Sequence, residues 1–188
     1  MTFDYFLFDT YAGFFAEVLP FAMIAGLLVY FIRYHKDKTT PKMKKAASCL
    51  LVSYLVGLML LVAMLYPVKA LWHLILYGND GGIEITWFQG SVHLLPDFFT
   101  HINKEVIGNV LAFVPFGVLF PLAHDKATIA KTTLAGFAVS LIIELTEPIF
   151  SRCLEVNDLI MNTLGAFLGA VIIFAVRRAV KVKHKDQA

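Results

Sequence analysis

The sequence has little charge. Only 16% of its 188 residues are Asp, Glu, Lys or Arg, whereas soluble domains carry roughly a quarter. Together with 59% hydrophobic residues, this composition excludes an ordinary soluble domain. The two cysteines, Cys49 and Cys153, do not form a metal motif or a disulfide framework. The chain also lacks internal repeats, a glycine-rich phosphate loop and a nucleophile elbow.

Five apolar stretches are long enough to cross a bilayer. A helix needs about 20 mostly apolar residues to span a hydrocarbon core of ~30 Å. The predicted spans are residues 12–32, 46–66, 106–123, 132–150 and 159–176. The sequence therefore predicts an all-α, polytopic membrane helix bundle that forms a single integral membrane domain over residues 1–188.

The basic residues are unevenly distributed between the two sides of this bundle. Thirteen of the sixteen Lys and Arg residues lie on one side, in the loop 33–45, the third-to-fourth loop and the tail after Val176. By the positive-inside rule that side is cytoplasmic. We expect an extracellular N-terminus and a cytoplasmic C-terminus in a multi-pass plasma-membrane protein. Because topology accounts for the basic tail, no nucleic-acid partner is expected.

Residues 67–105 form one long connection, which this topology places outside the cell. Aromatic residues at this density suit a segment at the outer interface; they include Trp72, Tyr77, Trp87, Phe88, Phe98 and Phe99. Three histidines, His73, His93 and His101, have no recognised ligand spacing and are expected to be solvated or interfacial. No metal site and no cofactor are predicted.

The fourth and fifth spans contain polar residues that a bilayer normally rejects. Ionisable groups inside a membrane segment are costly and by default mark a functional site. At 100° per residue, Glu144 and Glu147 share a stripe about 80° wide with Gly136 and Ser140. Small residues allow helices to approach closely, so packing roles are predicted for Gly136, Gly165 and Gly169. The polar stripe of each helix is expected to face the other.

The same residues converge at one depth. A rise of 1.5 Å per residue places Glu144 and Glu147 roughly 5–9 Å below the outer end of their helix. Pro148 lacks an N–H and is expected to bend or end that helix. The groups predicted to line an outward-facing cleft with the two acids are Asn109, Arg152, Asp158 and Asn162. Glu17 on the first span lies at a comparable depth and could join them.

Two interpretations of this polar group remain open. Two carboxylates at i and i+3 in a poorly hydrated cleft cannot both ionise cheaply. Glu144 and Glu147 would then provide a proton donor beside an acceptor, as general acid/base catalysis requires. Arg152 would alternatively neutralise one of them through a bidentate contact. The second interpretation is a satisfied polar network that locks the helices together.

Two blocks of residues resemble the VanZ-like family of bacterial membrane proteins. The first block, HLLPDFF…IGNVLAFVPFGVLFPL, matches the family at Pro96, Asn109, Phe113, Pro115 and Gly117. The second, SLIIELTEPIFSRCLEVNDLIMNTLGAFLG, matches at Glu144, Glu147, Arg152, Asp158, Asn162, Thr163 and Gly165. The resemblance covers about residues 92–169. The family often has Gln where this chain has Glu147.

The resemblance implies a role in the cell envelope, because the family is known through teicoplanin resistance. It favours a protein that lowers susceptibility to such lipoglycopeptides, with a cleft that binds a membrane lipid, a lipid-linked peptidoglycan precursor or the anchor of the antibiotic. One alternative is a membrane enzyme acting on a lipid-linked substrate with Glu144 and Glu147 as acid and base. A proton-coupled transporter is less expected, because five helices without an inverted repeat would need a homo-oligomer to supply the missing half.

Overall fold

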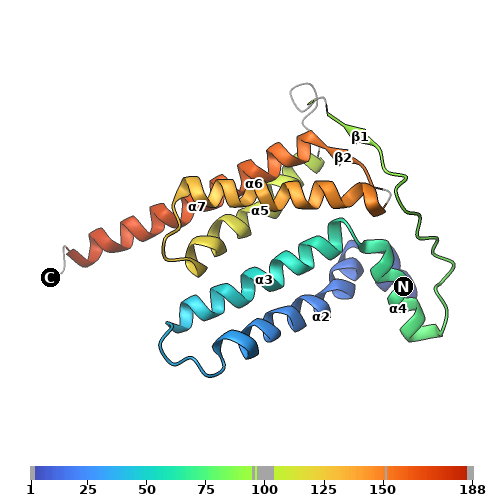
Figure 1. Ribbon diagram of the computed structural model, residues 1–188, viewed down its shortest axis with the longest axis horizontal. Helices are drawn as coiled ribbons and strands as arrows, with labels where there is room; N and C mark the ends of the chain where they lie inside the picture. Colours follow the sequence, from blue (N-terminus) through green and yellow to red (C-terminus); the bar gives the residue numbers. More distant parts are fainter. Residues whose placement is uncertain (1–2, 95, 97–103, 151, 186–188) are drawn as a thin grey trace.

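The computed structural model describes residues 3–94, 96, 104–150 and 152–185, and these residues are almost entirely helical. Five helical stretches are long and apolar enough to cross a membrane. They are Tyr11–Tyr34, Lys42–Val62, Val106–Ala123, Ile129–Phe150 and Val156–Val182. Each stretch overlaps one of the five predicted spans, although the second ends at Val62 rather than at residue 66, and the prediction of an all-α membrane bundle is confirmed (Figure 1).

The long helices are named as in Figure 1. Helix α2 (Tyr11–Val29) continues into the π-helical turn Tyr30–Tyr34, and α3 (Lys42–Val62) returns beside it. Helices α5 (Lys104–Ala123), α6 (Ile129–Thr146) and α7 (Val156–Lys185) form the remainder of the bundle. Helix α7 extends beyond the predicted fifth span into the basic tail.

The sequence did not predict the helices outside the five spans. Helix α1 (Phe3–Asp9) precedes α2, and α4 (Leu65–Tyr77) occupies the start of the long 67–105 connection. Pro67 lies in the first turn of α4, where a helix tolerates a residue without an N–H. Gly78 ends α4 with a φ of 71°, in the left-handed region that glycine adopts without strain.

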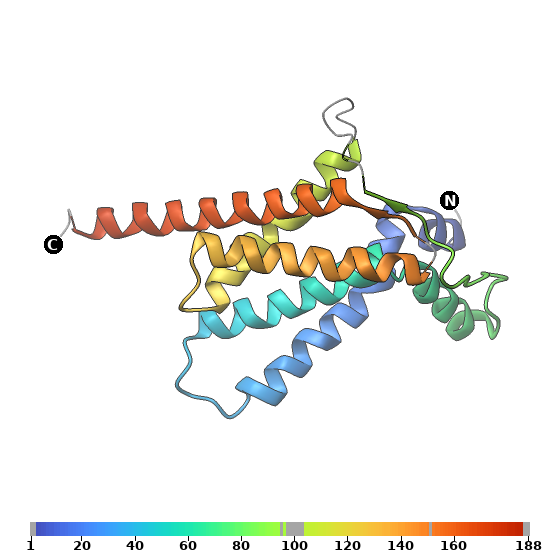
Figure 2. The same ribbon diagram turned by 45° about the horizontal axis from the view of Figure 1, so that its top comes forward.

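The core lies where α5, α6 and α7 meet and where α3 packs on α5 (Figure 2). Its largest buried side chains are Phe113 and Phe116 of α5, which pack with Ala166 of α7 and Leu51 of α3. Helix α5 approaches α7 closely at Gly117. A Cβ at that position would lie 2.2 Å from the carbonyl oxygen of Ala166 and 2.8 Å from Cα of Gly169. The absence of a side chain therefore sets the spacing of these two helices.

The two ends of the bundle differ in character. At one end, an ion pair between Lys44 and Asp125 connects the first turn of α3 to the loop that joins α5 to α6. Nearby, Nη2 of Arg177 donates to the carbonyl oxygen of Pro121 at 3.0 Å. At the other end lie the N-terminus, α4 and the connection between α6 and α7 (Figure 1). The polar residues of the fourth span are at this second end.

The close approach at Gly117 predicts opposite effects for two alanine substitutions in the same helix. Gly117→Ala should destabilise the protein by about 1–3 kcal/mol, because the new Cβ meets backbone atoms that cannot move aside. Gly108→Ala should be neutral or stabilising, because nothing lies within 4 Å of a Cβ there. Thermal unfolding of the purified protein in detergent measures both effects. Equal unfolding temperatures for the two variants would contradict this packing.

Candidate functional site

Helix α6 ends where the sequence predicted a break. The α-helical part stops at Thr146, and residues Glu147–Phe150 continue as a 3₁₀ turn (η2) around Pro148. Proline cannot donate the next helical hydrogen bond, so the backbone tightens and then leaves the helix. Glu144 and Glu147 lie on the last turn, with 2% and 3% of their surface exposed. Both acids are therefore buried at the junction between α6 and α7.

Glu144 is satisfied by the backbone of the strand that follows. The residues Leu154–Glu155 form strand β2, directly before α7. The backbone N–H of Glu155 donates to Oε2 of Glu144 at 3.0 Å. A carboxylate with such a donor avoids part of the cost of leaving water. The hydrogen bond also fixes the point at which the chain enters α7.

Glu147 forms an ion pair with Arg152, which lies on the short connection before α7. Nε of Arg152 lies 3.4 Å from Oε1 of Glu147, and the backbone N–H of Arg152 donates to the carbonyl oxygen of Glu147 at 3.0 Å. The arginine side chain is 41% exposed, whereas that of Glu147 is 4% exposed. The ion pair thus crosses the boundary between the buried acids and the surface. Asp158, in the first turn of α7, lies within electrostatic range of both glutamates.

One turn deeper, α6 and α7 are joined by a buried polar contact. Nδ2 of Asn162 donates to Oγ of Ser140 at 2.9 Å, and both residues are buried. Gly136, one further turn along α6, lies against Cβ of Ala166 in α7. Polar groups at a helix interface in a membrane are expected to bond to each other rather than face lipid. The polar stripes of the two helices therefore do face each other.

The predicted small residues of α7 face a different neighbour. A Cβ at Gly165 would meet the carbonyl oxygen of Val110, and one at Gly169 would meet that of Val114, both in α5. Helix α7 is thus contacted by α6 through polar groups and by α5 through glycines. Asn109 is half-buried one turn before Phe113 on α5. Among the described residues, its side chain makes no hydrogen bond to the two glutamates.

The long connection returns across the α6–α7 junction. Strand β1 (Val92–His93) pairs in parallel with β2, and the N–H of Leu154 donates to the carbonyl oxygen of Ser91 at 2.9 Å. The N–H of Phe88 donates to the carbonyl oxygen of Ile149 at 3.1 Å. We call residues 88–93 the covering segment. Figure 1 shows this part of the chain running from α4 to the strand pair along one end of the bundle.

The covering segment approaches the junction too closely for an ordinary side chain at its middle. A Cβ at Gly90 would lie 2.0 Å from the carbonyl oxygen of Arg152 and 2.6 Å from Cα of Pro148. Phe88 has a φ of 58°, a left-handed conformation that bulky residues adopt at a cost. These positions indicate that the segment is held against the junction by specific contacts.

Glu17 does not belong to the hydrogen-bonded network of α6 and α7. It is fully buried on α2, and its carboxylate has no hydrogen-bond partner among the described residues. Its neighbourhood is α4, where Nε1 of Trp72 donates to the backbone carbonyl oxygen of Glu17 at 2.9 Å. The depth argument placed Glu17 correctly near this end of the bundle, but depth carries no information about which way a helix is rotated.

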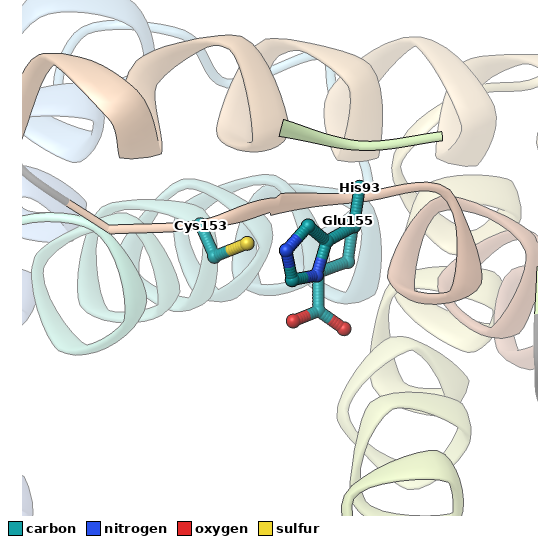
Figure 3. A group of neighbouring side chains, drawn as sticks. All are labelled: His93, Cys153 and Glu155. Atoms are coloured by element: carbon teal, nitrogen blue, oxygen red, sulfur yellow. The ribbon is translucent and has the colours of Figure 1, made fainter. Parts of the chain in front are cut away.

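A cluster that the sequence did not predict lies at the strand pair. His93, Cys153 and Glu155 each place one potential metal-ligand atom within 4.8 Å of the others (Figure 3). Sequence spacing could not reveal this group, because His93 is brought to the other two only by the pairing of β1 with β2. Of the other expected interfacial residues, His101, Phe98 and Phe99 lie outside the described residues.

Comparison with known proteins places this site in a recognised family. A family model described as VanZ/LLP1 matches residues 21–177, which include all five spans except the start of the first and the end of the fifth. A curated relative, Protein VanZ of Enterococcus faecium, is 32% identical over 108 residues. That alignment covers 56% of this chain and 66% of the relative, slightly less than two thirds of its length. No solved structure shows a significant match.

Proposed function

This chain belongs to the VanZ/LLP1 family of bacterial membrane proteins, and on that premise we propose that it lowers susceptibility to teicoplanin-type lipoglycopeptides. In this proposal the protein binds an envelope ligand at the α6–α7 junction. The ligand is an amphiphile with an apolar chain and a polar head, namely a membrane lipid, a lipid-linked peptidoglycan precursor or the lipid-anchored antibiotic.

The observation that supports the proposal best is the ion pair between Arg152 and Glu147. Nε of the Arg152 guanidinium lies 3.4 Å from the buried carboxylate of Glu147, and the arginine side chain is 41% exposed. A guanidinium has further N–H donors in the same plane, in a geometry that suits phosphate or carboxylate. Arg152 would therefore bind an anionic head group while Glu147 holds the side chain in place.

The proposal requires the junction to face outward, where the antibiotic and its target lie. The distribution of basic residues supports this orientation, since the loop 33–45 and the tail after Val176 hold most of them. In this orientation the covering segment is extracellular and the Lys44–Asp125 end is cytoplasmic.

Single-cysteine labelling tests the orientation. In a chain in which Cys49 and Cys153 are replaced by serine, we introduce Asp80→Cys or Lys38→Cys, two exposed positions at opposite ends of the bundle. A membrane-impermeant maleimide should label Asp80→Cys in intact cells and Lys38→Cys only after permeabilisation. The reverse pattern would place the junction in the cytoplasm and overturn the proposed function.

Charge-neutralising variants of the junction test the binding role. Glu144→Gln, Glu147→Gln and Arg152→Ala should each abolish protection against teicoplanin, because each removes a group that orients or contacts the ligand. The measurement is the inhibitory concentration in a susceptible host, normalised to the amount of folded protein in the membrane. Glu84→Gln is the matched control, since it removes the same charge from an exposed position.

The two interpretations of the polar network give different results in this experiment. If the junction is a ligand site, the variants lose protection against teicoplanin while the protein stays folded and inserted in the membrane. If the network is purely structural, the variants first lose folded protein, because each unsatisfied buried group lowers the free energy of unfolding by roughly 1–3 kcal/mol. Full protection by all three variants at normal expression would exclude the junction as the functional site.

A second candidate function is an enzyme that uses Glu144 and Glu147 as acid and base on a lipid-linked substrate. It is favoured by one observation, the unequal partners of the two carboxylates: a neutral amide for Glu144 and a guanidinium for Glu147. Acid and base catalysis by two carboxylates requires such different environments. Incubation of the purified protein with envelope lipids, followed by mass spectrometry, distinguishes the two functions, because only an enzyme changes the lipid profile.

A further inference from the structure

The strand pair places three metal-ligating side chains on one face. We propose that His93, Cys153 and Glu155 bind a thiophilic divalent cation, with Zn²⁺ as the best fit, and that the ion fastens the covering segment to the α6–α7 junction. The site would therefore regulate how firmly the junction is covered. It lies in the connections between the spans and needs no ligand at Arg152.

The positions follow from strand geometry. In a parallel pair, partner residues project to the same side, and residues two apart on one strand share that side. His93 is the register partner of Glu155, and Cys153 precedes Glu155 by two positions. The three side chains are therefore neighbours for a structural reason, and Figure 3 shows them gathered beside the strands. Ser91, two residues before His93, fits the same pattern, since its Oγ donates to Sγ of Cys153 at 3.1 Å.

The set of donors selects the class of ion. Imidazole nitrogen, thiolate sulfur and carboxylate oxygen are the three protein ligands of Zn²⁺, and a thiolate disfavours Mg²⁺ and Ca²⁺. Three protein ligands leave one position open for water or a further ligand. Bonds of about 2.0–2.3 Å in a tetrahedron place ligand atoms roughly 3.3–3.8 Å apart. The atoms here lie within 4.8 Å of one another and His93 is exposed, so small side-chain rotations would bring them to these distances.

Hydrogen bonds hold the backbone of the cluster in place without a bound ion. The N–H of Leu154 is bonded to Ser91, and the N–H of the next residue, Glu155, is bonded to Glu144. Adjacent amides of β2 are thus held from opposite sides, by the covering segment and by α6. Such preorganisation reduces the entropy lost when a ligand set closes around an ion. Glu155 also connects the proposed ion to the buried acid Glu144, because its side chain is a proposed ligand and its backbone N–H donates to Glu144.

Cobalt binding to the purified full-length chain in detergent tests this site, with Co²⁺ as a spectroscopic probe for Zn²⁺. The wild-type protein should bind one Co²⁺ per chain with a thiolate charge-transfer band in the near ultraviolet, and Zn²⁺ should displace it. Cys153→Ser should abolish the band. His93→Ala and Glu155→Gln should weaken binding by about tenfold or more. The matched controls are Cys49→Ser, the other free cysteine, and His73→Ala, which lies in α4.

Thermal unfolding keeps the result interpretable. Zn²⁺ should raise the unfolding temperature of the wild type and of both controls. It should not raise the unfolding temperature of Cys153→Ser or Glu155→Gln. The unfolding temperatures of these two variants without metal show whether they still fold. Cobalt binding without a thiolate band, unchanged binding by Cys153→Ser, or loss of binding by Cys49→Ser would each overturn the proposal. None of these outcomes changes the expected susceptibility of the Glu147 and Arg152 variants, so the two proposals fail separately.

Discussion

The structure at this end of the bundle depends on the cost of burying two carboxylates in a medium with few hydrogen-bond donors. Glu144 and Glu147 are both buried on the last turn of α6. Each receives a donor from the short connection to α7, the amide of Glu155 for the first and the guanidinium of Arg152 for the second. Because the donor for Glu144 is a backbone amide, the connection must fold back over the end of α6, and this hydrogen bond fixes both the strand β2 and the start of α7.

The same requirement positions the covering segment. Since the amide of Glu155 is turned toward α6, the amide of Leu154 is turned away from it and pairs with Ser91. The buried acid, the strand pair and the covering segment consequently form one connected unit. Under the proposed function, access of a ligand to the acids would depend on the state of this unit. A cation at His93 would act on the same unit from its outer side, and Arg152 would meet the ligand at its exposed edge.

Hydropathy and length were sufficient to predict the five spans, because a bilayer imposes both on any helix that crosses it. Helical phase was sufficient to place Ser140 of α6 opposite Asn162 of α7, where the two share a hydrogen bond. Helical phase and depth failed where the rotation of a helix about its axis, or the pairing of strands distant in sequence, decides which residues are in contact. Gly165 and Gly169 face α5 rather than α6, the backbone of Glu17 is bonded by a side chain of α4, and the cluster around His93 exists only because β1 pairs with β2. Helix α4 was missed because its 13 residues are too few for the span criterion.

The central claim is that the Glu147–Arg152 pair serves a ligand and is dispensable for folding. Replacing a buried ion pair by apolar residues of similar volume is often neutral or stabilising, whereas removal of one partner is not. The most direct test is therefore the double variant Glu147→Met with Arg152→Met, measured for unfolding temperature in detergent and for protection against teicoplanin in cells. The account predicts an unfolding temperature equal to or above that of the wild type together with complete loss of protection. Protection at the wild-type level in this double variant would contradict it.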